Sequence, residues 1–292
     1  MYEQRHLYNG KELQDELNIG WLDYNTRHYD ASIGRFLSQD IALEHYFNWS
    51  PYTYVKNNPL IFIDPSGMFT ELFKSNGKKI GEDEKGIDGK VRIVTDKSEI
   101  KRIKQNYKNN TPTESSSIKT GYETTKTTLT ESLNVLDRTL KKTPKDPEGG
   151  FHEESSLVMK NNKVIRGESG DKVQVKNGEL IGKASLPKLP EGSTYEDVEA
   201  AIHSHATGIL IADGVYYPMT ATEPSKGMFS DQTAFKFYEK NIIVGRLGRS
   251  TVTINTDGSY KTTKTPLGAV FYNNRSIEQL RLTVTAMKRI TK

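Results

Sequence analysis

The segment VEAAIHSHA, residues 198–206, is a mostly apolar run that holds two of the six histidines among 292 residues. Its composition predicts a buried β-strand. Because successive side chains of a strand point to opposite faces, His203 and His205 should project from one face, with their Cα atoms about 7 Å apart. Burying two unpaired imidazoles there would cost about 1–3 kcal/mol each, and a shared metal ion removes that cost.

A metal ion at these histidines needs a further ligand, which should be an oxygen because the sequence has no cysteine and a metal site can use only His, Asp, Glu and water. Catalytic zinc usually has three protein ligands and a water. Asp231 begins DQTAFKFYEK, residues 231–240, which predicts a helix followed by a strand that could return to the histidines. We therefore predict a zinc (Zn2+) site formed by His203, His205 and Asp231. The alternative for Asp231 is a helix cap alone.

The sequence around this strand predicts a mixed α+β domain over residues 126–292. Leucines at positions 129, 133, 136 and 140 line one stripe of an amphipathic helix. Several strand-like segments follow, among them a hairpin with Asn177-Gly178 at its turn. The segment SIEQLRLTVTAMKRI, residues 276–290, predicts a closing helix.

The two preceding regions differ from this domain in composition. Residues 1–68 are aromatic and rich in turn signals, which predicts short strands with Tyr24, Tyr29 and Phe36 covering one face of a sheet. Residues 69–125 offer one strand and one short helix, followed by a polar stretch rich in Ser, Thr, Lys and Asn. With so little to bury, this second region is predicted to be a tether with little structure.

The phrases YNGKEL, WLDYNTRHYDASIGRFLSQD and SPYTYVKNNPLIFIDPSG resemble the closing segment of the Rhs/YD-repeat core of bacterial polymorphic toxins. This resemblance covers nearly all of residues 5–68. It implies an all-β core fragment that belongs to a cage around a C-terminal toxin, with the border at Asp64-Pro65-Ser66-Gly67. It also implies self-cleavage by aspartates matching Asp40 and Asp64, although Ile41 stands where a proline is usual. The alternative is that both aspartates are turn residues.

A second resemblance covers roughly residues 127–275. A glutamate on an early strand, then His-x-His, then a serine and an aspartate resemble the JAB/MPN metallopeptidases (JAMM type), and in particular the JAB-like toxin domains behind Rhs cores. This resemblance implies a central sheet flanked by helices. It also implies zinc held by His203, His205 and Asp231, a glutamate that activates the water, and a serine that steadies the oxyanion.

Two of these roles have alternatives in the sequence. In FHEESSLV both Glu153 and Glu154 are available, and the small and apolar residues after them favour Glu153. Only one of the two can face the site, since neighbours in a strand point opposite ways. The motif of the resembled family places its serine three residues before the aspartate, and Met228 stands at that position here. Ser225 or Ser230 would therefore have to supply the hydroxyl.

These features predict a toxin effector that acts as a zinc-dependent peptidase or isopeptidase on a protein of a target cell. The alternative is a catalytically degenerate scaffold that binds a protein partner without hydrolysis. An immunity protein and the upstream Rhs cage are the further expected partners. The effector would be made in the cytoplasm and delivered or secreted without a signal peptide of its own, since the start of the chain has no apolar segment.

Charge and hydropathy exclude other classes of function. The 41 Lys and Arg and 37 Asp and Glu are spread along the chain, and no basic stripe with interleaved aromatic residues surrounds the histidines. Nucleic-acid binding is therefore not indicated. No window approaches the roughly 20 apolar residues of a membrane span.

Overall fold

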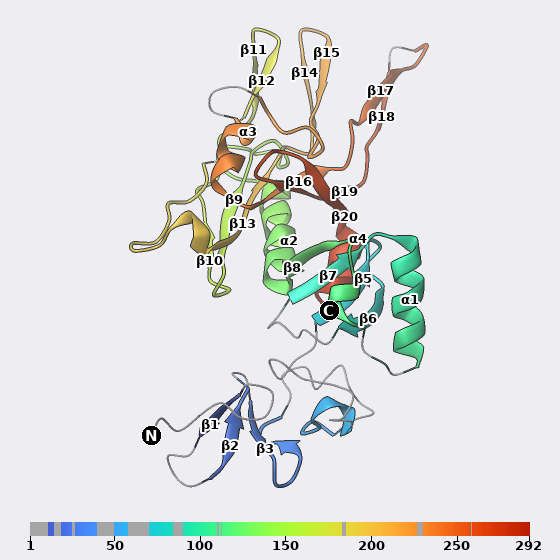
Figure 1. The fold of residues 1–292 in the computed structure, drawn as a ribbon. Helices are drawn as coiled ribbons and strands as arrows, with labels where there is room; N and C mark the ends of the chain where they lie inside the picture. Colours follow the sequence, from blue (N-terminus) through green and yellow to red (C-terminus); the bar gives the residue numbers. More distant parts are fainter. Residues whose placement is uncertain are drawn as a thin grey trace. The chain divides into compact units, whose positions relative to one another are not determined.

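The computed structural model divides the chain into two compact units, Met1–Lys74 with Lys79–Glu123, and Ser75–Lys78 with Thr124–Lys292 (Figure 1). The residues described are 11–14, 19–24, 27–39, 50–57, 70–83, 90–109, 111, 113–182, 185–226, 230–257 and 259–292.

The first unit begins with a four-stranded antiparallel sheet. Its strands β1 (Glu12–Gln14), β2 (Trp21–Asp23), β3 (His28–Asp30) and β4 (Arg35–Phe36) pair in chain order. The rings of Tyr24, Tyr29, Phe36 and Tyr54 pack together at centroid distances of 4.3–5.9 Å. The hydroxyl groups of Tyr24 and Tyr54 lie 2.9 Å apart. Aromatic side chains thus provide this short sheet with its core, as the sequence predicted.

The prediction of a tether over residues 69–125 is wrong, because this region contains a second sheet and a helix. Strands β5 (Thr70–Lys74), β6 (Lys79–Asp83), β7 (Lys90–Val94) and β8 (Tyr122–Thr125) pair in the order β6-β5-β7-β8, and α1 spans Lys97–Lys108. A few apolar residues suffice for the core, namely Leu72, Ile80, Val94, Ile103 and Ile118.

The polar stretch after α1 is held by side chains instead of a large apolar surface. The carboxylate of Glu99 accepts hydrogen bonds from the backbone N–H groups of Lys119 and Thr120, at 2.7 and 3.2 Å. Ser115 donates to Asp83 at 2.8 Å. Composition alone does not reveal such partners, because they lie about 20 to 30 residues apart in the sequence.

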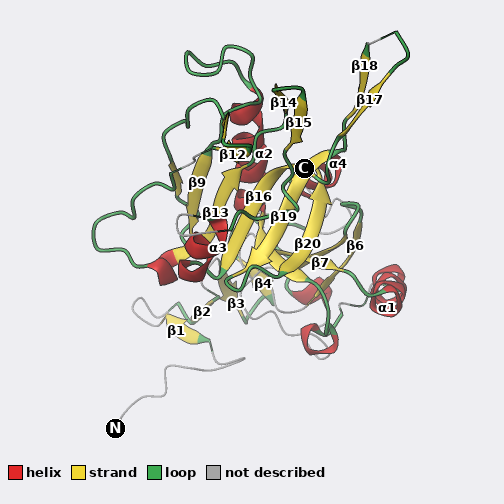
Figure 2. Cartoon of the chain, turned by 90° about the horizontal axis from the view of Figure 1, so that it is seen from above, coloured by secondary structure: helices red, strands yellow, loops and turns green. Residues whose placement is uncertain are grey.

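The second unit is built on a six-stranded sheet (Figure 2). The strand order is β10 (Val164–Arg166), β9 (Ser155–Met159), β13 (Val198–Ser204), β16 (Lys240–Arg246), β19 (Leu267–Asn273) and β20 (Glu278–Thr283). Strands β13 and β16 are parallel, and the other neighbours are antiparallel. Every residue of β13 is buried, which fits its central place and its apolar sequence.

Two helices pack on this sheet. Helix α2 (Lys126–Leu140) contacts β9, β13 and β16, helix α4 (Val284–Ile290) contacts β19 and β20, and the two helices contact each other. Leu129 and Leu136 of the predicted leucine stripe are buried, whereas Leu140 at the end of α2 is exposed. The two helices therefore share one face of the sheet.

Three hairpins extend the second unit: β11 (Gln174–Lys176) with β12 (Glu179–Ile181), β14 (Ile209–Ala212) with β15 (Val215–Pro218), and β17 (Thr251–Ile254) with β18 (Tyr260–Thr263). Asn177 and Gly178 both have positive φ, 52° and 77°, as a tight hairpin turn requires. The predicted turn is therefore confirmed.

The predicted MPN/JAB-like arrangement, a central sheet flanked by helices, is wrong. Helices and strands both occur, but the described residues are mainly strands divided among six sheets, and only four α-helices are present among them. Helix α3 (Asp231–Ala234) is a single turn that continues into the 3-10 turn Phe235–Phe237. No helical layer formed by the described residues covers the face opposite α2 and α4.

The closing segment explains part of this difference. Residues 276–290 were predicted to be one helix, but their first half is strand β20, and only Val284–Ile290 is helical. Leu280 and Leu282 are buried while their neighbours Gln279 and Arg281 are exposed, which is the period of two of a strand. Pairing with β19 offers this segment backbone hydrogen bonds that the sequence does not reveal.

Candidate metal centre

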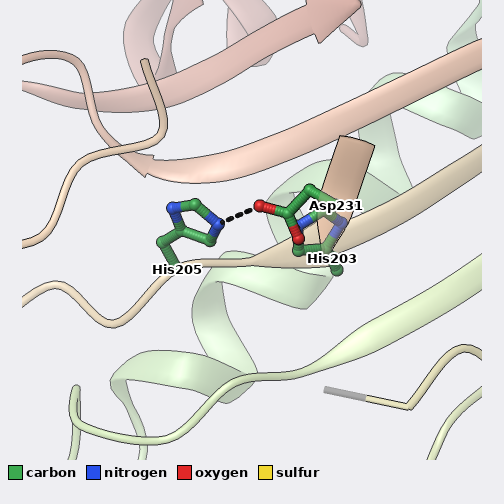
Figure 3. Close-up of side chains that lie close together, drawn as sticks. All are labelled: His203, His205 and Asp231. Carbon is green, nitrogen blue, oxygen red and sulfur yellow. Dashed lines mark hydrogen bonds and ion pairs between the residues drawn. The ribbon is translucent and has the colours of Figure 1, made fainter. Parts of the chain in front are cut away.

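Three predicted ligands meet at the end of strand β13. The Nε2 atoms of His203 and His205 lie 3.0 Å from Oδ1 and Oδ2 of Asp231, respectively (Figure 3). Ligand atoms of all three residues lie within 4.8 Å of one another. The group could hold a metal ion, since two nitrogens from one strand and an oxygen from the first residue of α3 converge on one place.

The sheet fixes the orientation of the two imidazoles. His203 pairs with Ile243 of β16 and with Ser155 of β9, and the backbone N–H of His205 donates to the carbonyl of Val244 at 2.9 Å. Nδ1 of His205 lies 2.8 Å from the carbonyl oxygen of Thr220. Because that carbonyl can only accept, Nδ1 carries the proton and Nε2 faces the carboxylate.

The environment of His203 provides a test of whether these residues suit a metal. Its Nε2 atom is buried, and although Oδ1 of Asp231 is close, the pair lacks the geometry of a hydrogen bond. A buried polar nitrogen without a hydrogen bond is costly. A cation between this nitrogen and the carboxylate would satisfy both atoms, so the donor set fits a metal.

Asp231 is held by Ser225. The backbone N–H of Ser225 donates to Oδ2 of Asp231 at 2.7 Å, and the backbone N–H of Asp231 donates to Oγ of Ser225 at 2.9 Å. These reciprocal bonds hold the carboxylate through Oδ2, the oxygen that also faces His205, and they tie the start of α3 to the preceding loop.

The pKa values of His205 and Asp231 are shifted in opposite directions by their contact. Burial opposes the charged imidazolium of His205, but the hydrogen bond to Asp231 and the charges of Asp231 and Glu153 outweigh burial and raise the pKa of His205 to about 9. Burial likewise opposes the charged carboxylate of Asp231, yet the two histidines hold its pKa well below the ordinary value. In the absence of a metal, the proton on His205 thus balances the carboxylate, and a bound cation would take its place.

The two candidate glutamates lie in different surroundings. Glu153 lines the same cleft as His203, His205 and Asp231. Glu154 instead accepts from Nε of Arg138 at 3.1 Å and from Ser169, on the side of the strand that faces α2. The structure therefore places Glu153, and not Glu154, in the cleft with the three candidate ligands.

His152 shares the surroundings of Glu154. It is fully buried, with Nδ1 2.8 Å from Asp146 and Nε2 3.3 Å from Glu154. His152 is not among the residues that line the cleft.

Both candidate serines line the cleft. Ser225 is exposed and its oxygen accepts from Asp231, whereas Ser230 is buried directly before α3. Met228 lies outside the described residues, as do Asp40 and Asp64, the two aspartates of the predicted self-cleavage.

The cleft has a volume of about 550 Å³ and polar residues that the sequence analysis did not single out. Thr220 orients His205, and Glu223 forms a two-pronged ion pair with Arg249, with N···O distances of 2.5–3.2 Å. The apolar part of its wall includes Leu186, Ala201 and Phe235. These contacts join residues 15 to 26 positions apart, and no local motif marks them.

No helix among the residues described is both long and apolar enough to cross a membrane.

Comparison with known proteins adds one short similarity. The chain is 43% identical over 61 residues to the salivary gland surface protein 1 of Aedes aegypti, which covers 21% of this chain and 2% of that protein. The chain thus spans a very small part of the length of this relative. No family model matches the sequence, and no solved structure matches it.

Proposed function

We propose that this chain is a polymorphic-toxin effector whose second unit is a zinc-dependent peptidase or isopeptidase acting on a protein of a target cell. The observation that carries the hydrolase proposal is the convergence of His203, His205 and Asp231 in a cleft that Glu153 also lines. The resemblance of residues 5–68 to an Rhs core supports the toxin context, with the upstream cage and an immunity protein as partners.

The ligand set supports zinc in particular. Two imidazoles and one carboxylate, without thiolates, form a three-ligand set of the type that catalytic zinc uses, and they leave a fourth position for water or substrate. Bound zinc would polarise a carbonyl group and lower the pKa of a water molecule to roughly 7. The cleft provides the access that a catalytic site needs and a purely structural zinc site lacks.

Glu153 is the proposed general base and acid. Its carboxylate would take a proton from the attacking water and pass it to the leaving amine, which is chemistry that a partly shielded carboxylate performs well. Glu153 is 8% exposed, and its negative charge acts on His205 across the cleft. Glu154 is unsuited to this role because Arg138 and Ser169 occupy its oxygens.

Ser225 is the better placed of the two candidates to donate a hydrogen bond to the oxyanion. Its oxygen already accepts the N–H of Asp231, so its own hydroxyl proton is free to point elsewhere, and its side chain is exposed in the cleft. Losing such a donor typically costs about 10²–10³ in rate.

The second candidate function is a scaffold that binds a protein partner at the same cleft without hydrolysis. The presence of Met228 at the expected serine position favours it, because the hydrolytic proposal requires a substitute hydroxyl.

Metal content and cleavage together distinguish these proposals. The full chain, purified without added metal, should contain one equivalent of zinc by elemental analysis, and His203→Ala should lose it. Chelator-sensitive cleavage of a peptide mixture that is abolished in Glu153→Gln, with zinc retained, supports the peptidase. Zinc without cleavage supports the scaffold, and a chain that binds no zinc contradicts the peptidase and leaves only a metal-free scaffold.

A further inference from the structure

A second cavity, of about 320 Å³, lies between two hairpins of the second unit. Ile209, Ile211 and Tyr216 line it from β14–β15, and Val252, Tyr260, Thr262 and Lys264 line it from β17–β18 and the residue that follows. The rings of Tyr216 and Tyr260, both part of this lining, lie at a centroid distance of 6.3 Å and are tilted by 60° to each other. Figure 1 shows these hairpins projecting from the same end of the sheet. We refer to this space as the hairpin cavity.

Strand alternation explains which side chains enter the hairpin cavity. Tyr260, Thr262 and Lys264 are spaced by two along β18 and its extension, and all three line the cavity. Lys261 and Thr263 alternate with them and are not part of the lining. The cavity wall is thus one face of a regular hairpin.

Arg246, at the end of β16, is a positively charged residue in the lining of the hairpin cavity. Its Nε donates to the carbonyl of Thr207 at 3.2 Å and its Nη1 donates to the carbonyl of Thr265 at 2.7 Å, which fixes the guanidinium group in place. No carboxylate among the described residues pairs with it, in contrast to Arg249 and Arg281, which pair with Glu223 and Glu278. Burial lowers the pKa of Arg246, and no neighbouring acid opposes this effect.

The lining as a whole is positive and apolar. Arg246 and Lys264 contribute two cations, and no acid of the described residues lines the cavity. A partly buried guanidinium without a counter-charge is costly, and an incoming carboxylate would offset that cost with charge-assisted hydrogen bonds. The cavity is therefore complementary to an anion.

The exposed side chains around the cavity indicate the kind of molecule that carries this anion. Ile211 and Tyr260 are 48% and 57% exposed, and Ile254, which pairs with Tyr260, is 64% exposed. Apolar and aromatic side chains around a fixed arginine are typical of the centre of a protein interface. The hairpin turns carry Asp213 and Asp257, so a long polyanion such as a nucleic acid would meet acidic groups beyond the two cations of the lining, whereas a single carboxylate at Arg246 and Lys264 need not.

We propose that the hairpin cavity binds an acidic segment of a protein partner, with a carboxylate on Arg246 and Lys264 and with apolar side chains against Tyr216, Tyr260 and Ile211. This site is distinct from the metal centre, which has its own cleft and shares no lining residue with it. The proposal does not rest on the proposed hydrolysis.

Selection from a random peptide library displayed on phage, with the full chain as bait, tests this site. Selected peptides should carry an Asp, a Glu or a free C-terminal carboxylate next to aliphatic or aromatic residues. A selected peptide, labelled with fluorescein, then gives a Kd by anisotropy. Replacing its acid by the amide, or amidating its C-terminus, identifies which carboxylate binds and should weaken binding about tenfold.

Variants of the chain complete the test. Lys264→Gln and Arg246→Gln should weaken the acidic peptide about tenfold, and the amide peptide should bind Arg246→Gln no more weakly than the wild type. The matched control is Lys261→Gln, which removes a charge from the same strand on the face away from the cavity. If Arg246→Gln fails to fold because Thr207 and Thr265 lose their donor, Lys264→Gln, at an exposed position, carries the test.

Three results would overturn the proposal: selected peptides without an excess of acids, equal losses in Lys264→Gln and Lys261→Gln, or displacement of the peptide by a single-stranded oligonucleotide at lower concentration than by the unlabelled peptide. The last result would assign the cavity to nucleic acid.

Discussion

Ser225 and Asp231 bind each other through two backbone N–H groups, with donor–acceptor distances of 2.7 Å to the carboxylate and 2.9 Å to the hydroxyl. The carboxylate that faces His203 and His205 is thus oriented by a loop residue six positions earlier in the chain. Partners of this kind set the direction of a ligand although they do not touch the metal.

Ser225→Ala should weaken zinc binding about tenfold, because the N–H of Asp231 loses its acceptor and the start of α3 is released. Competition with a chromophoric chelator measures this affinity. Ser259→Ala, which changes only an exposed hydroxyl that binds Asp257 at a hairpin turn, is the control and should leave the affinity unchanged. Equal affinities in all three proteins would contradict a role of Ser225 in orienting Asp231.

Glu153→Gln and Glu154→Gln should affect different properties, the first the catalytic rate and the second the stability of the fold. The first should lower kcat by about 10²–10⁴ without loss of zinc, because it removes the proposed proton carrier. The second should lower the free energy of unfolding by about 1–3 kcal/mol, because Glu154 is buried and its charge is hydrogen-bonded to Arg138. Peptide cleavage and urea denaturation measure the two effects, and a stable but inactive Glu154→Gln would reverse the assignment.

The metal-free chain should lose stability as the pH rises from about 6.5 to 9. The pKa of His205 is raised from its ordinary value of 6.5 to about 9 in the folded chain, so the stability it contributes is complete below 6.5 and is lost through this interval. Asp231 has the opposite sign, since its lowered pKa contributes stability above about 3.8 that is lost at more acid pH.

Urea denaturation of chelator-treated protein at several pH values measures this dependence. His205→Gln should remove the loss between pH 6.5 and 9. Zinc affinity should rise over the same interval, because the metal must displace the protons from the imidazoles. A metal-free chain that becomes more stable from pH 6.5 to 9 would contradict the ion pair between His205 and Asp231.

Leu282→Ala should lower the free energy of unfolding by about 2–5 kcal/mol, because Leu282 is completely buried on strand β20. Gln279→Ala, at an exposed position of the same strand, should change it by less than about 0.5 kcal/mol. If residues 276–290 formed one helix instead, Gln279 and Leu282 would lie three positions apart on the same helical face, and both substitutions should lower the free energy of unfolding. Similar losses in the two variants would therefore contradict strand β20.

Periodicity alone was sufficient for several elements. The apolar run of residues 198–206 indicated a buried strand, the leucine stripe indicated α2, and Asn177-Gly178 indicated a hairpin. In each case the information lies within a short window of sequence, because side-chain alternation, helical spacing and positive φ are local properties. The same local reasoning failed for residues 276–290, where a helical pattern and a strand pattern compete and β19 decides between them.

The sequence by itself indicated that His203 and His205 project from the same face of a strand, and it determined that no thiolate can be a metal ligand. Only the tertiary structure showed that the carboxylate of Asp231 lies beside both imidazoles, that Glu153 and not Glu154 lines the cleft, and that Arg246 lines a cavity between two hairpins with no acid of the described residues paired to it. Alternation along a strand depends on neighbours in the chain. Whether β13 lies next to α3, or β16 next to two hairpins, depends instead on how the whole sheet is assembled, which is a property of the entire unit.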